Sequence, residues 1–193
     1  MSRPDPSSVT HFEALYQNSV DPWQFGSAPY EQQRYAVLLR MLGRPAYRRA
    51  LEPGCSIGAF TQMLAARCDE LVAFDFSPTA ISAARNRCRE LSHVRIFKAD
   101  AAIYRAEGAF DLIVLSEMGY YFQPGTLYRI ASQLAATLAP GGEFVACHWL
   151  GSSDDHVMHA DQVHAILAES LALRRLESGR FDGFRVERWM REA

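Results

Sequence analysis

The chain has 193 residues, of which 49% are hydrophobic and 22% are charged, so it is long enough for one globular domain and too apolar for a disordered protein. Its 20 basic and 22 acidic residues give a net charge of −2, which argues against nucleic-acid binding through phosphate neutralisation. Residues 1–8 contain no apolar segment typical of a signal peptide, and no apolar run approaches the ~18–20 residues that span a bilayer. We therefore expect a cytoplasmic protein with neither a nucleic-acid nor a membrane partner.

Two helices are expected near the N-terminus. Thr10 and Glu13 have the spacing of a capping box, which predicts the start of the first helix. Pro29 suits the first turn of the second helix, and Gly43 predicts its end. We expect residues 1–45 to act as a helical lid, because nothing else in so short a chain can cover a site.

Strands alternate with helices from residue 49 onward. Strand-like runs occur at residues 50–52, 71–75, 94–97, 110–115 and 143–147. Helical patterns, with apolar residues three or four apart, lie between them. This order favours right-handed crossovers and an α/β fold with a doubly wound, mostly parallel sheet.

The C-terminal part adds a helix and two further strands. The helix is predicted at residues 160–169. The strand-like runs at 171–176 and 184–189, separated by turn residues, are expected to pair as an antiparallel hairpin at one edge of the sheet. Four arginines of this hairpin are expected to face solvent: Arg174, Arg175, Arg185 and Arg188.

A glycine-containing loop follows the first predicted strand, in the sequence LEPGCSIG of residues 51–58. In an open parallel sheet, ligands bind at the carboxyl ends of the strands. Gly54 and Gly58 allow a tight turn and a close approach of the backbone to a ligand. The spacing differs from the dinucleotide motif G-x-G-x-x-G, and Glu52 would repel a pyrophosphate. The loop therefore favours a cationic or zwitterionic ligand.

Two more acidic residues follow the next two strands. Asp75 ends the second strand, where a carboxylate can accept hydrogen bonds from both ribose hydroxyls. Asp100 follows the third strand, where an adenine amino group would need an acceptor. Either residue alone is typical of a surface or capping carboxylate. Together with Glu52 they predict a pocket for a nucleoside that carries no phosphate.

These motifs resemble those of the class I S-adenosylmethionine-dependent methyltransferases, in residues 51–61 (LEPGCSIGAFT), 74–78 (FDFSP), 110–117 (FDLIVLSE) and 138–142 (LAPGG). More narrowly, residues 21–23 (DPW), 30–34 (YEQQR) and 116–121 (SEMGYY) resemble the nodulation protein S family. Members of that family N-methylate the free amino sugar of a deacetylated chitooligosaccharide. The resemblance covers about residues 12–149, and Ser56 stands where most class I members carry glycine.

The resemblance implies a seven-stranded Rossmann-like sheet, S-adenosyl-L-methionine as cofactor and S-adenosyl-L-homocysteine as product. The expected substrate is a small-molecule or oligosaccharide amine. We expect one domain over residues 1–193, in which the lid precedes a cofactor-binding core at 46–149 and an acceptor-side helix and hairpin at 150–193. Twelve residues of the lid and the strand ends are expected to bind the cofactor: Trp23, Arg34, Glu52, Gly54, Cys55, Ser56, Gly58, Asp75, Phe76, Asp100, Ala101 and Ser116.

Two of these assignments concern the lid. Arg34 is expected to clamp the methionine carboxylate of the cofactor, because a guanidinium can bind a carboxylate through two N–H groups. Trp23 supplies aromatic surface. We expect residues 10–40 to order over the bound cofactor and to complete the acceptor site.

Methyl transfer from a sulfonium is an in-line displacement, so the protein mainly aligns the reactants and excludes water. An amine acceptor must also arrive neutral, which makes a nearby proton acceptor useful. Three residues at strand ends are the catalytic candidates: Glu117, Tyr121 and His148. Glu117 could hold an ammonium group or take its proton, or it could instead cap the next loop. His148 suits a base, or it could be a structural histidine bonded to a neighbouring loop.

Other functions remain open at this point. An O-methyltransferase acting on a hydroxyl or carboxylate would need a true base. An NAD-dependent oxidoreductase or a non-enzymatic cofactor-binding module would share the sheet. The four cysteines contain no C-x-x-C pair, and the spacing of His156, His159 and His164 fits metal ligands only loosely, so no metal is expected.

Overall fold

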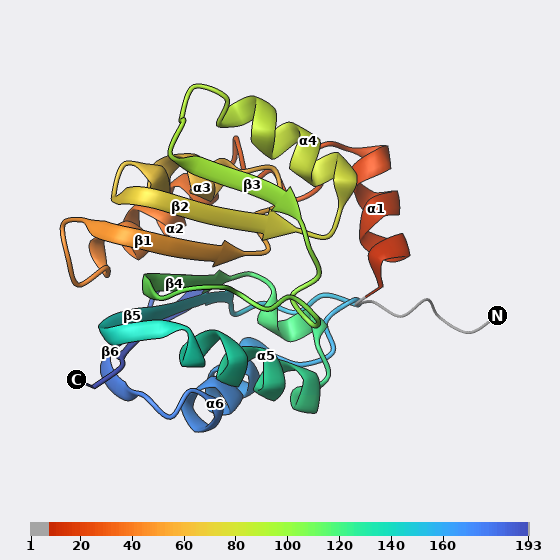
Figure 1. Ribbon diagram of the computed structural model, residues 1–193. Coiled ribbons are helices and arrows are strands. Elements are labelled where there is room, and N and C mark those ends of the chain that lie inside the picture. Colours follow the sequence, from red (N-terminus) through yellow and green to blue (C-terminus); the bar gives the residue numbers. More distant parts are fainter. Residues whose placement is uncertain (1–7, 193) are drawn as a thin grey trace.

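The computed structural model describes residues 8–192, which form one seven-stranded sheet in the order β3-β2-β1-β4-β5-β7-β6 (Figure 1). The strands are β1 (Tyr47–Pro53), β2 (Cys68–Asp75), β3 (Val94–Lys98), β4 (Phe110–Ser116), β5 (Leu138–Trp149), β6 (Arg174–Arg180) and β7 (Phe184–Met190). Strands β1 to β5 pair in parallel, and β7 is antiparallel to both β5 and β6. The predicted doubly wound, mostly parallel sheet with a C-terminal antiparallel hairpin is confirmed.

The helices follow the strands as the alternation predicts. They are α1 (Val9–Asn18), α2 (Pro29–Arg40), α3 (Ala59–Ala65), α4 (Pro78–Arg87), the short 3-10 helix η1 (Gly119–Tyr121), α5 (Pro124–Ala136) and α6 (Ala160–Ser170). Residues 1–7 of the N-terminal segment, predicted to be irregular, lie outside the described residues. None of the helices within residues 8–192 has the length and apolar character needed to cross a bilayer.

Apolar side chains on the two faces of the sheet enter different cores. Along β4, Leu112 and Val114 point to the core that contains α2 and α3, whereas Ile113 and Leu115 point to the core that contains α5 and α6. All four side chains are fully buried. This pattern follows from the period of two of a strand and from helices on both faces of a parallel sheet.

The strand order reverses between β1 and β4, which are adjacent although two strands separate them in sequence. A crevice for a ligand is expected at such a reversal, outside the carboxyl ends of the strands. Figure 1 shows α1 at the end of the sheet toward which the arrows of β1, β2 and β3 point. The lid helix and the strand ends therefore face each other.

The start of α1 differs from the prediction. The N-cap is Ser8, whose side chain accepts a hydrogen bond from the His11 N–H, so Thr10 lies inside the helix. Glu13 does not complete a capping box, because its carboxylate accepts hydrogen bonds from the hydroxyls of Ser77 and Thr79. Glu13 thus ties α1 to the start of α4.

The hairpin also differs in detail. The first strand, β6, extends to Arg180 rather than ending at residue 176, and the turn occurs at residues 181–183, where Gly183 has a φ of +83°. The expectation that the hairpin arginines face solvent is wrong for Arg185 and Arg188. Their side chains are 22% and 15% exposed and form ion pairs with Glu187 and Glu143 respectively. Arg185 pairs with a buried carboxylate two residues along β7, and Arg188 pairs with a buried carboxylate on the neighbouring strand β5. The second contact has no signal in the local alternation.

Candidate active site

A cavity lies at the carboxyl ends of β1, β2 and β4. Nine of the residues expected to bind cofactor or act in catalysis line it: Trp23, Gly54, Ser56, Asp75, Phe76, Ala101, Ser116, Glu117 and Tyr121. A smaller cavity shares Gly54, Ser56 and Glu117 with the first and adds Arg34, Glu52 and Cys55. The predicted residues are therefore brought together, except for Gly58, Asp100 and His148.

The glycine loop approaches both cavities with little room for side chains. Gly54 has a φ of +71°, and a Cβ there would lie 2.8 Å from the sulfur of Met118. Ser56 also has a positive φ, of +49°, although it is not glycine. Gly58 caps α3, and a Cβ on it would lie 3.0 Å from the backbone of Ala84 in α4. Gly58 therefore allows the loop to pack on α4 rather than lining the cavity.

Asp75 is held by two backbone N–H groups at the end of β2. The Ser56 N–H donates to Oδ2 at 3.0 Å, and the Ser77 N–H donates to Oδ1 at 2.9 Å. The residue is 8% exposed, and burial raises the pKa of its carboxyl. These bonds fix a carboxylate in the cavity wall, with remaining lone pairs available to a ligand.

Asp100 does not line either cavity. Its Oδ1 accepts a hydrogen bond from the Ala102 N–H at 2.8 Å, which is the capping arrangement that the sequence left open. Its neighbours Ala99 and Ala101 line the larger cavity. The geometry of the cavity therefore does not support the predicted hydrogen bond between Asp100 and an adenine.

Glu52 is buried in the wall of the smaller cavity. The residue is 4% exposed, and its Oε2 has no hydrogen-bond partner among residues 8–192. Burial raises the pKa of Glu52 to about 8 against the opposing effect of the Thr61 hydroxyl, and the nearby carboxylate of Asp75 contributes to the rise. A buried carboxyl without a donor is costly unless a ligand supplies one. The wall therefore suits a positively charged hydrogen-bond donor.

Arg34 is almost fully buried between two carboxylates. Its Nε and Nη2 donate to Glu31 Oε2, and its Nη1 lies 3.1 Å from Glu117 Oε1 and 3.2 Å from Ser116 Oγ. The Coulombic attraction of Glu117, opposed by burial, raises the pKa of Arg34. The guanidinium lines the smaller cavity, but its N–H groups are directed to protein atoms. Arg34 therefore positions Glu117 in this structure.

Glu117 lies where the two cavities meet. The residue has a φ of +56°, directly after β4. Its Oε1 accepts the Trp149 N–H at 2.8 Å, and its Oε2 accepts the Tyr120 hydroxyl at 2.5 Å. With Arg34 these donors hold the carboxylate in one orientation. The backbone strain fits a functional position.

Aromatic rings from the lid cover the larger cavity. Phe12 and Tyr16 of α1 line it, and the sequence indicated them only as a helix face with apolar residues four apart. The ring of Phe12 packs edge-on against those of Tyr121 at 4.7 Å and Phe76 at 5.4 Å. The Tyr16 hydroxyl lies 2.6 Å from Ser56 Oγ. The lid helix is thus bonded directly to the glycine loop.

His148 lies outside both cavities, so its expected role as a base needs correction. The side chain is fully buried. Its Nε2 accepts the Gly119 N–H at 3.1 Å, and its Nδ1 lies 3.2 Å from His164 Nε2. Neither ring nitrogen can take a proton from a ligand in this arrangement. The alternative interpretation of the sequence, a histidine bonded to a neighbouring loop, describes His148.

The other histidines considered as metal ligands have different partners. The ring of His156 stacks on Tyr120 at 3.8 Å, and His159 caps α6. His164 bonds His148 and Glu187. Between residues 8 and 192, no group of three or more His, Cys, Asp or Glu side chains is arranged to hold a metal ion.

The comparisons with a family model and with related sequences agree on one family. A family model described as Nodulation protein S (NodS) matches residues 13–182. Nodulation protein S from Sinorhizobium fredii is 35% identical over 182 residues, which cover 89% of this chain and 82% of that protein. Nodulation protein S from Rhizobium tropici is 38% identical over 167 residues, which cover 81% of this chain and 68% of that protein.

Solved structures give the same result. The N-methyltransferase NodS from Bradyrhizobium japonicum, in complex with S-adenosyl-L-homocysteine, matches with a TM-score of 0.84 and 29% identity over 96% of this chain and 99% of that chain. A putative methyltransferase from Pseudomonas syringae matches with a TM-score of 0.75 and 39% identity, over 84% of this chain and 99% of that chain.

Proposed function

Because the chain belongs to the nodulation protein S family of S-adenosylmethionine-dependent N-methyltransferases, we propose that its acceptor is the free amino group of a sugar, in particular of a deacetylated chitooligosaccharide. Membership confirms the methyltransferase class and the cofactor that the sequence motifs implied. It also excludes the alternative functions of an NAD-dependent oxidoreductase and of a non-enzymatic binding module.

The observation that carries this proposal is the position of Glu117. Its carboxylate is fixed by Arg34, Tyr120 and the Trp149 N–H at the junction of the two cavities. An ammonium group entering the larger cavity would meet a negative charge there, whereas a neutral hydroxyl would gain less. The aromatic side chain of Tyr121 lies in the same wall and offers a surface for the apolar face of a sugar ring.

The chain's own residues fit the cofactor. The unpartnered carboxyl of Glu52 suits the amino group of a methionine moiety, and Asp75 suits the ribose hydroxyls. Ser56 and Gly54 place backbone beside the same space. Bound S-adenosylmethionine supplies a methyl group that is activated by a positively charged sulfur.

The remaining work of the protein is to orient the acceptor and to manage its proton. The rings of Phe12, Trp23 and Tyr121 line the larger cavity with apolar surface, which disfavours water beside the reacting atoms. Glu117 can hold the ammonium form of the acceptor through charge and accept its proton before attack, which leaves a neutral nitrogen. Because His148 is turned away, Glu117 is the proton acceptor that we assign to this step.

The test of this proposal compares matched acceptors. A chitooligosaccharide with one free amino group is expected to gain one methyl group from S-adenosylmethionine, as detected by mass spectrometry. The fully acetylated oligosaccharide of the same length, which lacks the amine, is the control and is expected to stay unmodified. Methylation of the acetylated control, or of a hydroxyl in either compound, would contradict the proposal.

The contact between lid and glycine loop gives a second prediction. Tyr16→Phe removes the hydroxyl that lies 2.6 Å from Ser56 Oγ and keeps the ring. Since one hydrogen bond contributes ~0.5–1.5 kcal/mol, S-adenosylhomocysteine is expected to dissociate about twofold to tenfold faster, as measured by stopped-flow fluorescence. Tyr128→Phe, on the exposed side of α5, is the control. An unchanged dissociation rate in Tyr16→Phe would show that the bond does not hold the lid.

A further inference from the structure

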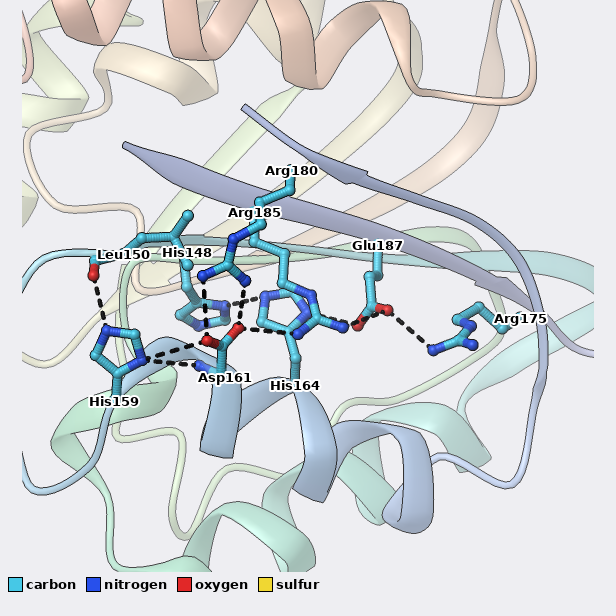
Figure 2. Close-up of polar contacts among 9 residues, drawn as sticks. All are labelled: His148, Leu150, His159, Asp161, His164, Arg175, Arg180, Arg185 and Glu187. Atoms are coloured by element: carbon cyan, nitrogen blue, oxygen red, sulfur yellow. Dashed lines mark hydrogen bonds and ion pairs between the residues drawn. The ribbon is translucent and has the colours of Figure 1, made fainter. Parts of the chain in front are cut away.

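Two histidines and a glutamate form a buried chain of hydrogen bonds behind the larger cavity (Figure 2). The Gly119 N–H donates to His148 Nε2 at 3.1 Å. His148 Nδ1 lies 3.2 Å from His164 Nε2, and His164 Nδ1 lies 2.7 Å from Glu187 Oε2. The chain runs from η1 through β5 and α6 to β7, and so joins four elements that are distant in sequence.

The positions of the protons in this chain follow from its first donor. Because His148 Nε2 accepts the Gly119 N–H, this nitrogen carries no proton, and neutral His148 must be protonated at Nδ1. His148 then donates to His164 Nε2, so His164 is protonated at Nδ1 and donates to Glu187. Every link has one donor and one acceptor only when both histidines are neutral and Glu187 is ionised.

The surroundings keep these groups in those states. Burial lowers the pKa of both His148 and His164. Burial alone would raise the pKa of Glu187, but hydrogen bonds from His164 and Arg185 lower it to about 2. Glu187 Oε1 also accepts from Arg175 at 3.1 Å, on the side that faces solvent. Figure 2 shows Arg175 beyond Glu187, at the end of the hydrogen-bond chain that is remote from His148, whereas Arg185 lies beside His164.

The hydrogen-bond chain ends at Gly119, which has no space to move closer to His148. A Cβ on Gly119 would lie 2.5 Å from Val163 Cγ1 and 2.7 Å from His148 Nε2. Gly119 begins η1, which carries Tyr120 and Tyr121. The hydroxyl of Tyr120 donates to Glu117, and the ring of Tyr121 lines the larger cavity. The position of the Gly119 N–H therefore sets the position of the acceptor-side wall.

We propose that His148, His164 and Glu187 are positioning residues for methyl transfer: the Glu187 carboxylate fixes the tautomers of both histidines, and His148 thereby presents an unprotonated nitrogen that anchors η1 at the acceptor site. None of the three touches the cavity. The effect on turnover rests on the proposed function of Glu117 and Tyr121. The tautomers and the anchoring of Gly119 do not depend on any substrate.

The first test uses the wild-type protein alone. Long-range ¹H–¹⁵N NMR correlations are expected to show His148 and His164 as Nδ1–H tautomers with unprotonated Nε2 atoms. In Glu187→Gln, the His164 Nδ1–H proton is expected to move upfield, because a neutral acceptor replaces a charged one. A wild-type His148 protonated at Nε2 would overturn the proposal whatever the acceptor is.

The second test separates the hydrogen bond from the packing of the ring. His148→Leu removes the acceptor, whereas His148→Gln places a carbonyl oxygen near the position of Nε2. In His148→Leu we expect faster exchange of the Gly119 amide proton, about a tenfold lower kcat with the amino-sugar acceptor, and an S-adenosylhomocysteine affinity within about threefold of wild type. His148→Gln is expected to restore both the exchange protection and most of kcat.

Two results would overturn the anchoring role. One is a folded His148→Leu protein whose Gly119 amide exchanges as slowly as in wild type. The other is a His148→Gln protein that is as impaired as His148→Leu, since the ring alone would then matter. If no amino sugar is methylated by wild type, the proposed function fails, but the NMR and exchange results still decide the role of the chain.

Discussion

Replacing Asp75 with alanine is expected to weaken the binding of S-adenosylhomocysteine by between tenfold and a hundredfold. Hydrogen bonds that involve a charged group contribute ~1.5–3 kcal/mol each, and the ribose of the ligand would lose its carboxylate acceptor. The substitution also leaves the N–H groups of Ser56 and Ser77 without the acceptor that orients them. Calorimetric titration of the folded variant measures the loss directly.

Two matched variants sharpen this experiment. Asp69→Ala removes an exposed carboxylate from the opposite end of β2 and is expected to bind like wild type. Asp100→Ala tests the disagreement between the sequence-based assignment and the cavity, which Asp100 does not line. We expect its affinity to stay within about threefold of wild type, since Asp100 bonds Ala102. A loss as large as that of Asp75→Ala would restore the adenine contact predicted from sequence.

The sheet could be predicted because its strands and most of its helices have recognisable patterns in the local sequence. Each buried parallel strand is a short apolar run, such as residues 110–115. Periodic helices follow β1, β2 and β4, whereas residues 99–109 join β3 to β4 without a helix. The ends of the elements were less predictable. Glu13 had a local partner in Thr10, but Ser77 and Thr79 of α4 compete for the same carboxylate. A tertiary contact of that kind has no local signal.

The site shows the same division. The predicted ends of the strands indicated which residues share one edge of the sheet, and Asp75, Glu52 and Glu117 line the cavities there. The strand ends did not indicate toward which face of the sheet each side chain points. Cys147 faces the core that contains α2, so His148, the next residue of β5, faces α6. Adjacent residues of β5 thus contact Arg34 on one face of the sheet and the hydrogen-bond chain on the other.

The contribution of the lid was the least visible in sequence. Arg34 was expected to clamp a ligand carboxylate, but Glu31 and Glu117 occupy its N–H groups. Glu31 lies three residues away on the same helix, so that pair could have been predicted from helical spacing. The pair with Glu117 depends on the packing of α2 against β4 and β5, which only the fold defines.

The second large effect is expected at Glu52, because protonation of its carboxyl opposes the binding of S-adenosylhomocysteine. With a pKa of about 8 in the folded protein, Glu52 is mostly protonated at pH 7, whereas the unfolded chain ionises near pH 4.5. The free energy of unfolding is therefore expected to fall as pH rises from about 4.5 to 8, and to level off above it. In Glu52→Gln this contribution to the pH dependence disappears.

A cationic amino group beside Glu52 would reverse this preference, because it favours the ionised carboxylate. If only the ionised form binds, the affinity for S-adenosylhomocysteine is expected to rise roughly 50-fold between pH 6 and pH 8. Binding at pH 7 is then expected to release about 0.9 proton. Calorimetry in two buffers with different enthalpies of ionisation measures that release.

Glu52→Gln should therefore change stability and binding in opposite directions. At pH 8 the variant without ligand is expected to have a higher Tm than wild type, because it no longer buries an ionising carboxyl. The same variant is expected to bind S-adenosylhomocysteine weakly, with no proton release and little dependence on pH. Glu90→Gln, at an exposed position, is the control for the loss of one acidic group. A Glu52→Gln variant that is less stable than wild type at pH 8, or that still releases a proton on binding, would show that another group holds the amino end of the ligand.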